Sequence, residues 1–194
     1  MPKLGMEPIR RAALVKATID EIGAQGSLDV TVSAIARRAG MSSALAHHYF
    51  GSKEQIFLAA MRHTLTDYGA EVRAALAEAE TPLARVEAIV SASFSGANFK
   101  ADVIAAWLNF YVLAQSQPDA RKLLTIYQAR LRSNLRHALR PLLHEAAPHA
   151  AERIAALIDG HYLRQSLVKD APDPAGATRI IMAALSFELE AHAQ

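Results

Sequence analysis

Hydrophobic residues recur every three or four positions along almost the whole 194-residue chain, which is the period of an amphipathic α-helix. The first such run extends from Pro8 to Gln25, and Gly26 follows at a position where a helix can end. Its apolar positions are Ile9, Ala12, Ala13, Val15, Ala17, Ile19 and Ile22. Because no segment alternates convincingly between apolar and polar residues, as a half-buried strand would, the pattern predicts an all-α fold of about nine helices.

Proline and glycine divide the rest of the chain into further helical segments. We expect two short helices within residues 31–50, and longer ones at about 53–80, 83–96, 102–116, 119–140, 149–168 and 175–191. Pro141 lies in "LRPLLHE", which has a helical pattern on both sides. Since proline lacks the backbone N–H that a helix interior requires, we expect a break or kink at that residue.

Residues 31–50 have the pattern of two short helices joined by a tight turn. Thr31 and Ser42 can each cap the start of a helix, and Gly40 permits the left-handed backbone that a sharp turn needs. Such a pair forms a helix-turn-helix, whose second helix can enter the major groove of DNA. An ordinary corner between two helices has the same spacing, so the pattern alone leaves both interpretations open.

The second short helix has a compact polar face that suits a DNA groove. Its exposed side chains would be Ser43, His47 and His48, while Leu45 and Phe50 would anchor it to the core. Lys53 and the hydroxyl of Tyr49 are placed to contact phosphates. Residues 1–62 contain eight Lys or Arg against five Asp or Glu, whereas the whole chain has a net charge of only +2. This bias weakly favours a polyanionic partner for the N-terminal third.

The segment "TVSAIARRAGMSSALAHHYFGSKEQIF", residues 31–57, resembles the DNA-binding motif of the TetR family of bacterial transcriptional regulators. The matching positions are Thr31, Ile35, Ala36, Ala39, Gly40, Met41, Ser42, Tyr49, Phe50 and Lys53. The segment departs from the family pattern in two places: Ala44 stands where glycine is usual, and the pair Ala46-His47 stands where Leu-Tyr is frequent. Both departures alter the surface that would meet DNA.

This resemblance implies a homodimer that binds an inverted-repeat operator in double-stranded DNA. It implies a helix-turn-helix DNA-binding domain at residues 1–52 and a helical ligand-binding and dimerisation domain at residues 53–194. The DNA-binding residues it indicates are Thr31, Arg37, Arg38, Ser42, Ser43, Ala44, His47, His48, Tyr49 and Lys53. The helix at 53–80 begins beside the recognition helix and would link the two domains. The segments 151–167 and 177–191 are long and amphipathic, which is typical of a dimer interface.

Within the TetR family, the chain resembles the choline-responsive repressors of the genes for glycine betaine synthesis. The similar stretches are "MPKLGM" at the start, "HYF" at 48–50, "AAWLNFY" at 105–111, "SNL" at 133–135 and "AALIDGHYLR" at 155–164. The resemblance implies that the effector is choline or a related quaternary ammonium compound and that no cofactor is required. A family member that responds to another cationic or hydrophobic ligand, as in efflux regulation, is the alternative.

Two stretches could supply a site for such a cation. A quaternary ammonium cannot donate a hydrogen bond, so it is held by aromatic faces and by carboxylates. Helical spacing places Trp107, Phe110 and Tyr111 on one face. The other candidates are Tyr127, Asp159 and Tyr162. An aromatic stripe of this kind is more often plain core packing, and Asp159 could instead pair with an arginine such as Arg164 or Arg130. The residues alone do not distinguish an aromatic cation-binding site from ordinary core packing.

Composition excludes several other classes of protein. The chain has no cysteine, which removes disulfides, thiolate zinc sites and cysteine nucleophiles. No histidine pair has metal-binding helical spacing, and no nucleophile or phosphate-loop motif occurs, so we expect neither a metal site nor an enzyme. An all-α enzyme using Asp159 and His161 and a protein-binding adaptor are the less favoured alternatives. Without a signal peptide or an apolar run of membrane-spanning length, we expect a cytoplasmic protein that does not bind membranes.

Overall fold

The computed structural model describes residues 5–168 and 170–192, and its secondary structure in these ranges is entirely helical. The described elements are α1 (Met6–Gln25), α2 (Val32–Arg38), α3 (Ser43–Phe50), α4 (Lys53–Glu78), α5 (Pro82–Ser93), α6 (Ala101–Ser116), α7 (Pro118–Leu143), a 3-10 turn at His144–Ala146, α8 (Ala147–Ser166) and α9 (Pro174–Ala191). The all-α prediction of about nine helices is confirmed. Most of the opening "MPKLGM" lies outside the described residues. In the described part, none of the helices has the length and apolarity to cross a membrane.

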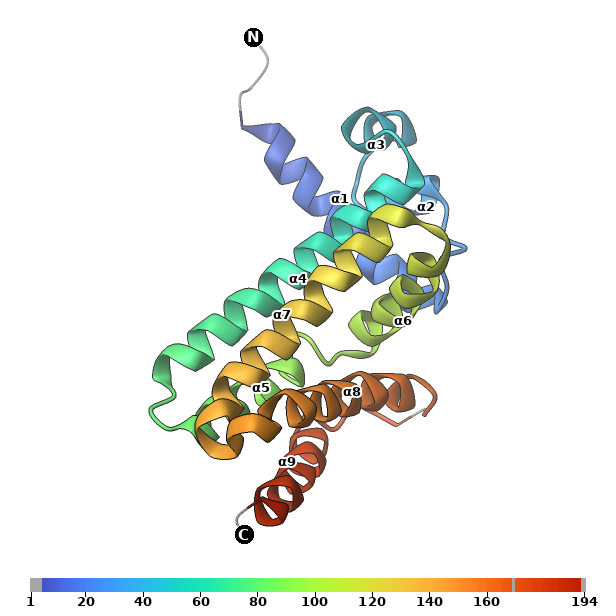
Figure 1. Cartoon of the computed structure of the whole chain (residues 1–194). Coiled ribbons are helices and arrows are strands. Elements are labelled where there is room, and N and C mark those ends of the chain that lie inside the picture. Colours follow the sequence, from blue (N-terminus) through green and yellow to red (C-terminus); the bar gives the residue numbers. More distant parts are fainter. Residues whose placement is uncertain (1–4, 169, 193–194) are drawn as a thin grey trace.

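Helices α1, α2, α3 and the first turns of α4 form one end of the molecule (Figure 1). Their shared core is small and tightly buried, and it consists mainly of Leu14, Ala17, Ile22, Val30, Ile35, Ala36, Ala46, Ile56 and Phe57. Each short helix begins with a side-chain cap: the hydroxyl of Thr31 accepts a hydrogen bond from the backbone N–H of Ala34, and that of Ser42 from Leu45. These caps fix where α2 and α3 start.

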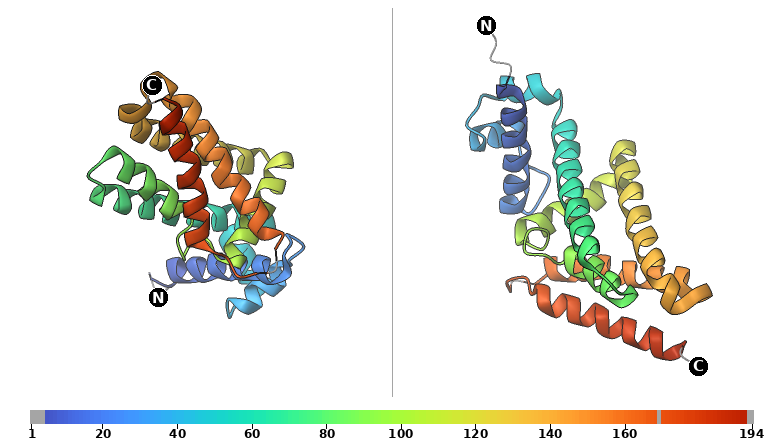
Figure 2. Two further views of the ribbon diagram at one scale, coloured as in Figure 1. Left: turned by 90° about the horizontal axis from the view of Figure 1, so that it is seen from below. Right: turned by 90° about the vertical axis from the view of Figure 1, so that its left-hand side faces the viewer.

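Helices α4 to α9 enclose a larger core at the other end of the molecule. Helices α4 and α7 run lengthwise, while α8 and α9 lie across the end opposite α3 (Figures 1 and 2). Helix α8 packs against α6, α7 and α9, and α5 packs against α4, α7 and α9. This arrangement brings residues from five different helices toward the middle of the larger core.

The two ends also meet through a close contact between α1 and α6. A Cβ placed on Gly23 would lie 2.3 Å from Cβ of Asp102, so only glycine permits this approach. The side-chain amide of Asn109 donates to the carbonyl oxygen of Gly26 at 3.4 Å, and Ala106 of α6 belongs to the N-terminal core. A boundary between residues 52 and 53 therefore crosses packed side chains, since the N-terminal core extends into α4 as far as Phe57.

Helix α7 differs from the sequence-based expectation near its end. It continues through Pro141 to Leu143 instead of breaking at the proline. The chain leaves the helix at His144, which has the positive φ of 47°. Pro141 removes the N–H that would donate to the carbonyl oxygen of His137, but only two helical residues follow it, so a distortion there displaces little of the helix.

Candidate functional site

The turn between α2 and α3 has the geometry of a helix-turn-helix. Gly40 adopts φ 69°, the left-handed conformation that was expected for the turn. The hydroxyls of Ser33 and Ser43 lie 3.0 Å apart and join the two helices directly. The hydroxyls of Thr31 and Ser42 are occupied as helix caps, at 3.0 and 3.2 Å from their N–H donors. These two residues thus orient the helix starts as well as being candidates for DNA contact.

Helix α3 turns one face to the solvent. Ala44, His47 and His48 are exposed, and the ring Nδ1 of His47 lies 2.9 Å from the carbonyl oxygen of Gly51. The fully buried residue on the opposite face is Ala46. Phe50 packs against the N-terminal core as expected, but Leu45 is only half-buried and lies outside that core cluster. Ala46 therefore provides the anchor that the sequence pattern predicts for Leu45. Its small side chain lets α3 approach the N-terminal core closely.

The basic residues near this face differ in how freely they can reach DNA. Arg37 is exposed, whereas Nε of Arg38 donates to Oε2 of Glu21 at 2.5 Å. This bond to Arg38 lowers the pKa of Glu21 and ties α2 to α1. Nζ of Lys53 lies 5.4 Å from the centre of the Phe57 ring, at the first turn of α4. Arg38 is thus engaged within the protein, and Lys53 remains beside the recognition helix.

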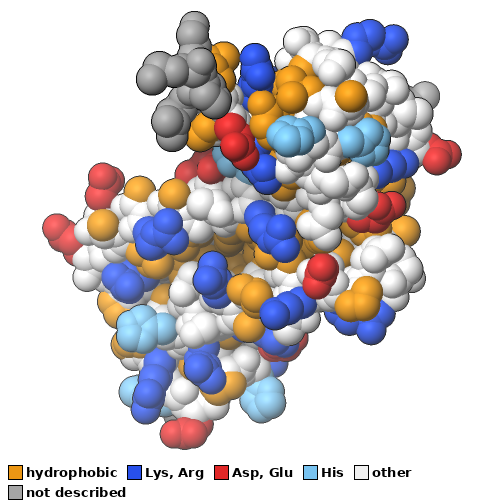
Figure 3. Space-filling model, turned by 90° about the horizontal axis from the view of Figure 1, so that it is seen from above, with side chains coloured by type: hydrophobic (Ala, Val, Ile, Leu, Met, Phe, Trp, Pro, Cys, Tyr) orange, Lys and Arg blue, Asp and Glu red, His pale blue; other side chains and the backbone are white. Residues whose placement is uncertain are grey.

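Sequence reasoning missed two arginines of α1 that lie against the recognition helix. The guanidinium of Arg10 donates to the hydroxyl of Tyr49 at 3.4 Å. Arg11 donates to the backbone carbonyl of Tyr49 at 2.6 Å and lies 4.6 Å from the centre of the Phe50 ring. They are almost forty positions from Tyr49 in the chain, so no local pattern could reveal the contact. Seen from this end, the surface carries scattered Lys, Arg and His side chains (Figure 3).

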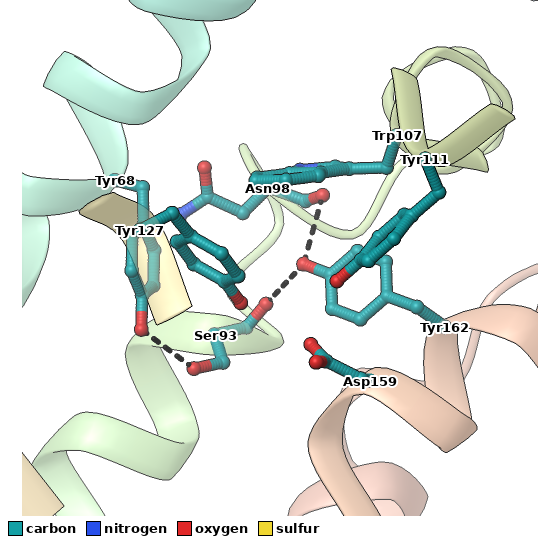
Figure 4. A pocket seen from close by; sticks show the side chains of 8 residues that line it. All are labelled: Tyr68, Ser93, Asn98, Trp107, Tyr111, Tyr127, Asp159 and Tyr162. Carbon is teal, nitrogen blue, oxygen red and sulfur yellow. Dashed lines mark hydrogen bonds between the residues drawn. The ribbon is translucent and has the colours of Figure 1, made fainter. Parts of the chain in front are cut away.

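Aromatic side chains from several helices surround one cavity in the larger core (Figure 4). Trp107 and Tyr111 come from α6, Tyr127 from α7, and Asp159 and Tyr162 from α8. The centre of the Trp107 ring lies 4.8 Å from that of Tyr127, 6.1 Å from that of Tyr111 and 6.5 Å from that of Tyr162. The structure thus brings together five of the six candidate ligand residues.

Phe110, the sixth candidate, does not line the cavity. It is 1% exposed and packs edge-to-face on Trp107, with the ring centres 6.1 Å apart. A spacing of three residues shares a helix face only approximately, so Tyr111, four positions after Trp107, reaches the cavity while Phe110 points into the core. Trp107 belongs both to the cavity wall and to the large buried cluster of the core.

Three further polar residues line the cavity: Tyr68 of α4, Ser93 of α5 and Asn98 of the following loop. The hydroxyls of Tyr68 and Ser93 lie 3.0 Å apart, and the hydroxyl of Tyr162 donates to the backbone carbonyl of Ser93 at 2.5 Å. Nδ2 of Asn98 donates to Oε2 of Glu71 at 2.7 Å. The first two bonds tie α4 and α8 to the end of α5, and the third ties the loop to α4. In the sequence, Tyr68 fits an ordinary helical stripe and gave no separate signal.

Among the described residues that line this cavity, Asp159 is the only carboxylate. Burial raises its pKa, and the nearby hydroxyls of Tyr111 and Tyr127 partly oppose that rise. Within residues 5–168 and 170–192 it forms no salt bridge, so neither Arg164 nor Arg130 neutralises it. Burial likewise raises the pKa of Tyr68 to about 12, so its hydroxyl stays protonated. The cavity therefore combines aromatic faces with one unpaired carboxylate, which is an environment suited to a cation.

The cavity is small in this conformation. Its volume is about 10 Å³, enough for roughly one water molecule. Its walls belong to α4, α5, α6, α7 and α8 together with the loop at Asn98. A cation with three methyl groups would have to move these walls apart before it could enter.

Two families of known proteins match most of the chain. Residues 14–60 match the bacterial regulatory proteins of the tetR family. The chain belongs to this family of transcriptional regulators. The prediction that the protein is a regulator, and not an enzyme, is therefore confirmed. Residues 82–190 match the C-terminal domain of the BetI-type transcriptional repressor. The chain is 50% identical to the HTH-type transcriptional regulator BetI of Brucella anthropi, over 97% of its own length and 98% of that protein. The BetI regulator of Rhizobium meliloti is 53% identical over 89% of this chain and 85% of its own.

Solved structures of more distant regulators share the fold. A transcriptional regulator from Pseudomonas aeruginosa superimposes with a TM-score of 0.81 at 24% identity, over 97% of this chain and 93% of its own. A regulator from Saccharomonospora viridis, solved in complex with choline, gives a TM-score of 0.78 at 20% identity, over 91% and 95% of the two chains. At these identities the likeness concerns the fold.

Proposed function

We propose that this chain is a repressor that binds an inverted-repeat operator and responds to choline, or to a closely related quaternary ammonium compound, to control genes for glycine betaine synthesis. The observation that carries the proposal is the cavity itself, which Trp107, Tyr111, Tyr127 and Tyr162 line together with the carboxylate of Asp159. The BetI regulators at about 50% identity and the choline complex of the regulator from Saccharomonospora viridis support the choice of ligand.

The cavity chemistry matches choline in three respects. Aromatic faces attract a quaternary ammonium without requiring a hydrogen-bond donor. The unpaired carboxylate of Asp159 adds charge attraction at a buried position, where it is weakly screened. The hydroxyl end of choline could bond to polar atoms such as those of Ser93 or Asn98, which line the same space. A neutral ligand of the same shape would lack the first two attractions.

Ligand entry would act on DNA binding by moving the cavity walls. Helix α4 carries Tyr68 in the cavity and begins, at Lys53, directly after the recognition helix. Helix α6 carries Trp107 and Tyr111 on one side, while its Ala106 packs in the core of the DNA-binding end. Both helices would transmit the expansion and change the separation of the two recognition helices in a dimer. A ligand that prefers one arrangement shifts the population toward it.

The proposed dimer uses the outer faces of α8 and α9. These faces expose large apolar side chains, namely Leu157, Leu163, Ile180 and Phe187, and Phe187 is 70% exposed. A two-fold axis through this surface would bury them and hold two DNA-binding ends on one side. The division into a DNA-binding domain at 1–52 and a ligand-binding and dimerisation domain at 53–194 belongs to the same proposal. The protein would act in the cytoplasm, where the operator is accessible.

The test measures operator binding and ligand binding on the same protein. A helix-turn-helix dimer reads two half-sites about 34–36 Å apart, or further apart by whole turns, so the operator should be an inverted repeat upstream of the regulated genes. Choline should weaken binding to this duplex, and the duplex should weaken choline binding by the same factor, since coupling is reciprocal. Betaine aldehyde and glycine betaine serve as competitors for effector identity. Equal choline affinity with and without the operator would refute the proposed coupling.

A further inference from the structure

A groove separate from the aromatic cavity runs along the outside of the larger domain between α4 and α7. Its volume is about 580 Å³, far larger than that of the cavity. All of its lining residues come from these two helices, from Arg62 to Leu76 on one side and from Leu123 to Asn134 on the other. Along α4 the groove extends for about 21 Å, from the rise of 1.5 Å per helical residue.

The floor of the groove is apolar. It is formed by Leu65, Val72, Leu76, Leu123, Ile126 and Leu131. Val72 and Leu131 lie deep, at 2% exposure each, and Ile126 is 41% exposed at the side. In Figure 3, hydrophobic side chains floor a hollow across the middle of the molecule, with Lys and Arg side chains beside it. A long apolar segment laid in this groove would be removed from water along most of its length.

The charged residues that line the groove are all arginines: Arg62 and Arg73 on α4 and Arg130 on α7. In the described ranges 5–168 and 170–192, none of the three forms a salt bridge. The guanidinium of Arg73 lies over Gly69, where a Cβ would be 3.3 Å from Nη1 of Arg73, so the glycine leaves room for this cation in the groove.

The acidic residues of the same stretch of α4 are engaged elsewhere. Oδ2 of Asp67 lies 3.3 Å from Nε2 of His63. Oε2 of Glu71 accepts hydrogen bonds from Ser95 at 2.6 Å and from Asn98 at 2.7 Å. The groove therefore presents a positive charge beside an apolar floor, and none of the described residues that line it carries a carboxylate to offset that charge.

We infer that this groove is a second ligand site, which binds a free long-chain carboxylate of the fatty-acid type. The apolar chain would lie on the floor between α4 and α7, and the carboxylate would bind the guanidinium groups of Arg73 and Arg130. Guanidinium groups match carboxylates in both charge and planar geometry. The charge complementarity excludes the quaternary ammonium ligands of the inner cavity from this groove, so the two sites select opposite charges.

The two sites share a wall, which gives the second ligand a route to influence the first. Tyr68 and Tyr127 line both the groove and the cavity, and their rings meet edge-to-face with centres 5.8 Å apart. A chain bound in the groove would hold this pair in place from outside. The inference about the groove does not rest on choline being the ligand of the cavity, because it uses different residues and a different charge.

Calorimetric titration of the full-length protein with monomeric laurate, at neutral pH and low salt, tests the inference. Laurate should bind, while 1-dodecanol, which has a tail of the same length and no charge, should bind at least about tenfold more weakly because it cannot pair with the guanidinium groups. Arg73→Gln and Arg130→Gln should each weaken laurate binding by about fivefold, and added salt should weaken it further. Ile126→Glu should weaken binding more strongly, because it places a negative charge beside the tail.

Arg136→Gln is the matched control, since Arg136 is an exposed arginine of α7 that does not line the groove. It should leave laurate affinity unchanged, and circular dichroism should show that every variant is folded. Equal binding of 1-dodecanol and laurate, or equal loss of laurate affinity in Arg136→Gln, would overturn the inference. Binding only to phosphatidylglycerol vesicles would overturn it in favour of a membrane surface. A change of oligomeric mass in Ile126→Glu would overturn it in favour of a second copy of the chain.

Discussion

The close approach of α1 and α6 makes Gly23 an informative position for mutation. An added Cβ would lie 2.3 Å from Cβ and 2.5 Å from Cα of Asp102, so the neighbour is backbone and cannot rotate away. Gly23→Ala therefore forces the two helices apart or distorts them. Gly160 of α8 is the matched control, because a Cβ there meets nothing within 4 Å.

The two substitutions share one favourable contribution to the free energy of unfolding, and only one of them bears an additional cost. Alanine in place of glycine inside a helix stabilises it by up to about 1 kcal/mol, and this applies to both positions. Overpacking at a tight contact costs about 1–3 kcal/mol, and only Gly23 bears this cost. We expect Gly160→Ala to be more stable than the parent protein, and Gly23→Ala to lie about 1–3 kcal/mol below Gly160→Ala.

Thermal unfolding followed by circular dichroism measures this difference at one fixed protomer concentration, since a dimer's melting point depends on concentration. For a chain of this length, each 1 kcal/mol corresponds to about 2–4 °C in Tm. A Gly23→Ala protein that melts at or above Gly160→Ala would refute the close packing of α1 on α6. It would also remove α6 as a rigid link between the cavity and the DNA-binding end.

Three further outcomes follow from individual side chains. Lys53→Ala should weaken binding to every duplex and reduce the slope of log affinity against log salt by about one, as filter-binding titrations would show; an unchanged slope removes Lys53 from the phosphate contacts. The bond from Arg38 lowers the pKa of Glu21 below its ordinary 4.5, so its stabilisation is present above that pH and is lost as pH falls through the lowered value. Melting curves of Arg38→Gln should therefore show a smaller loss of Tm on acidification. Choline affinity should fall as pH drops through the raised pKa of Asp159, and calorimetry of Asp159→Asn should show no such dependence.

The local sequence pattern was sufficient to predict the positions of the helices and the turn of the DNA-binding motif. Helix boundaries follow from caps and glycines: Thr31 and Ser42 accept from backbone N–H groups, and Gly40 takes the left-handed conformation. These are contacts between residues near in sequence. The end of α7 was placed wrongly at Pro141 because the helix tolerates a proline near its last turn.

The candidate site was predictable only where residues shared a helix or a familiar motif. Trp107 with Tyr111, and Asp159 with Tyr162, are helical neighbours at the cavity. Tyr68 and Ser93 reach the same cavity from other helices, and Arg10 reaches Tyr49 across almost forty positions, so tertiary packing alone brings them there. The contact of Gly23 with Asp102 depends on the same long-range packing.

The most direct test of cation recognition by the aromatic cavity is the emission of Trp107, the only tryptophan in the chain. Titration with choline should shift or quench this emission. The neutral isostere 3,3-dimethylbutan-1-ol has the same shape without the charge, so it should bind more weakly by about 1–2 kcal/mol, or roughly five- to thirtyfold. If choline and the isostere bind equally, or if neither changes the emission and calorimetry detects no binding, Trp107 and its neighbours are core packing and the cavity is not a cation site.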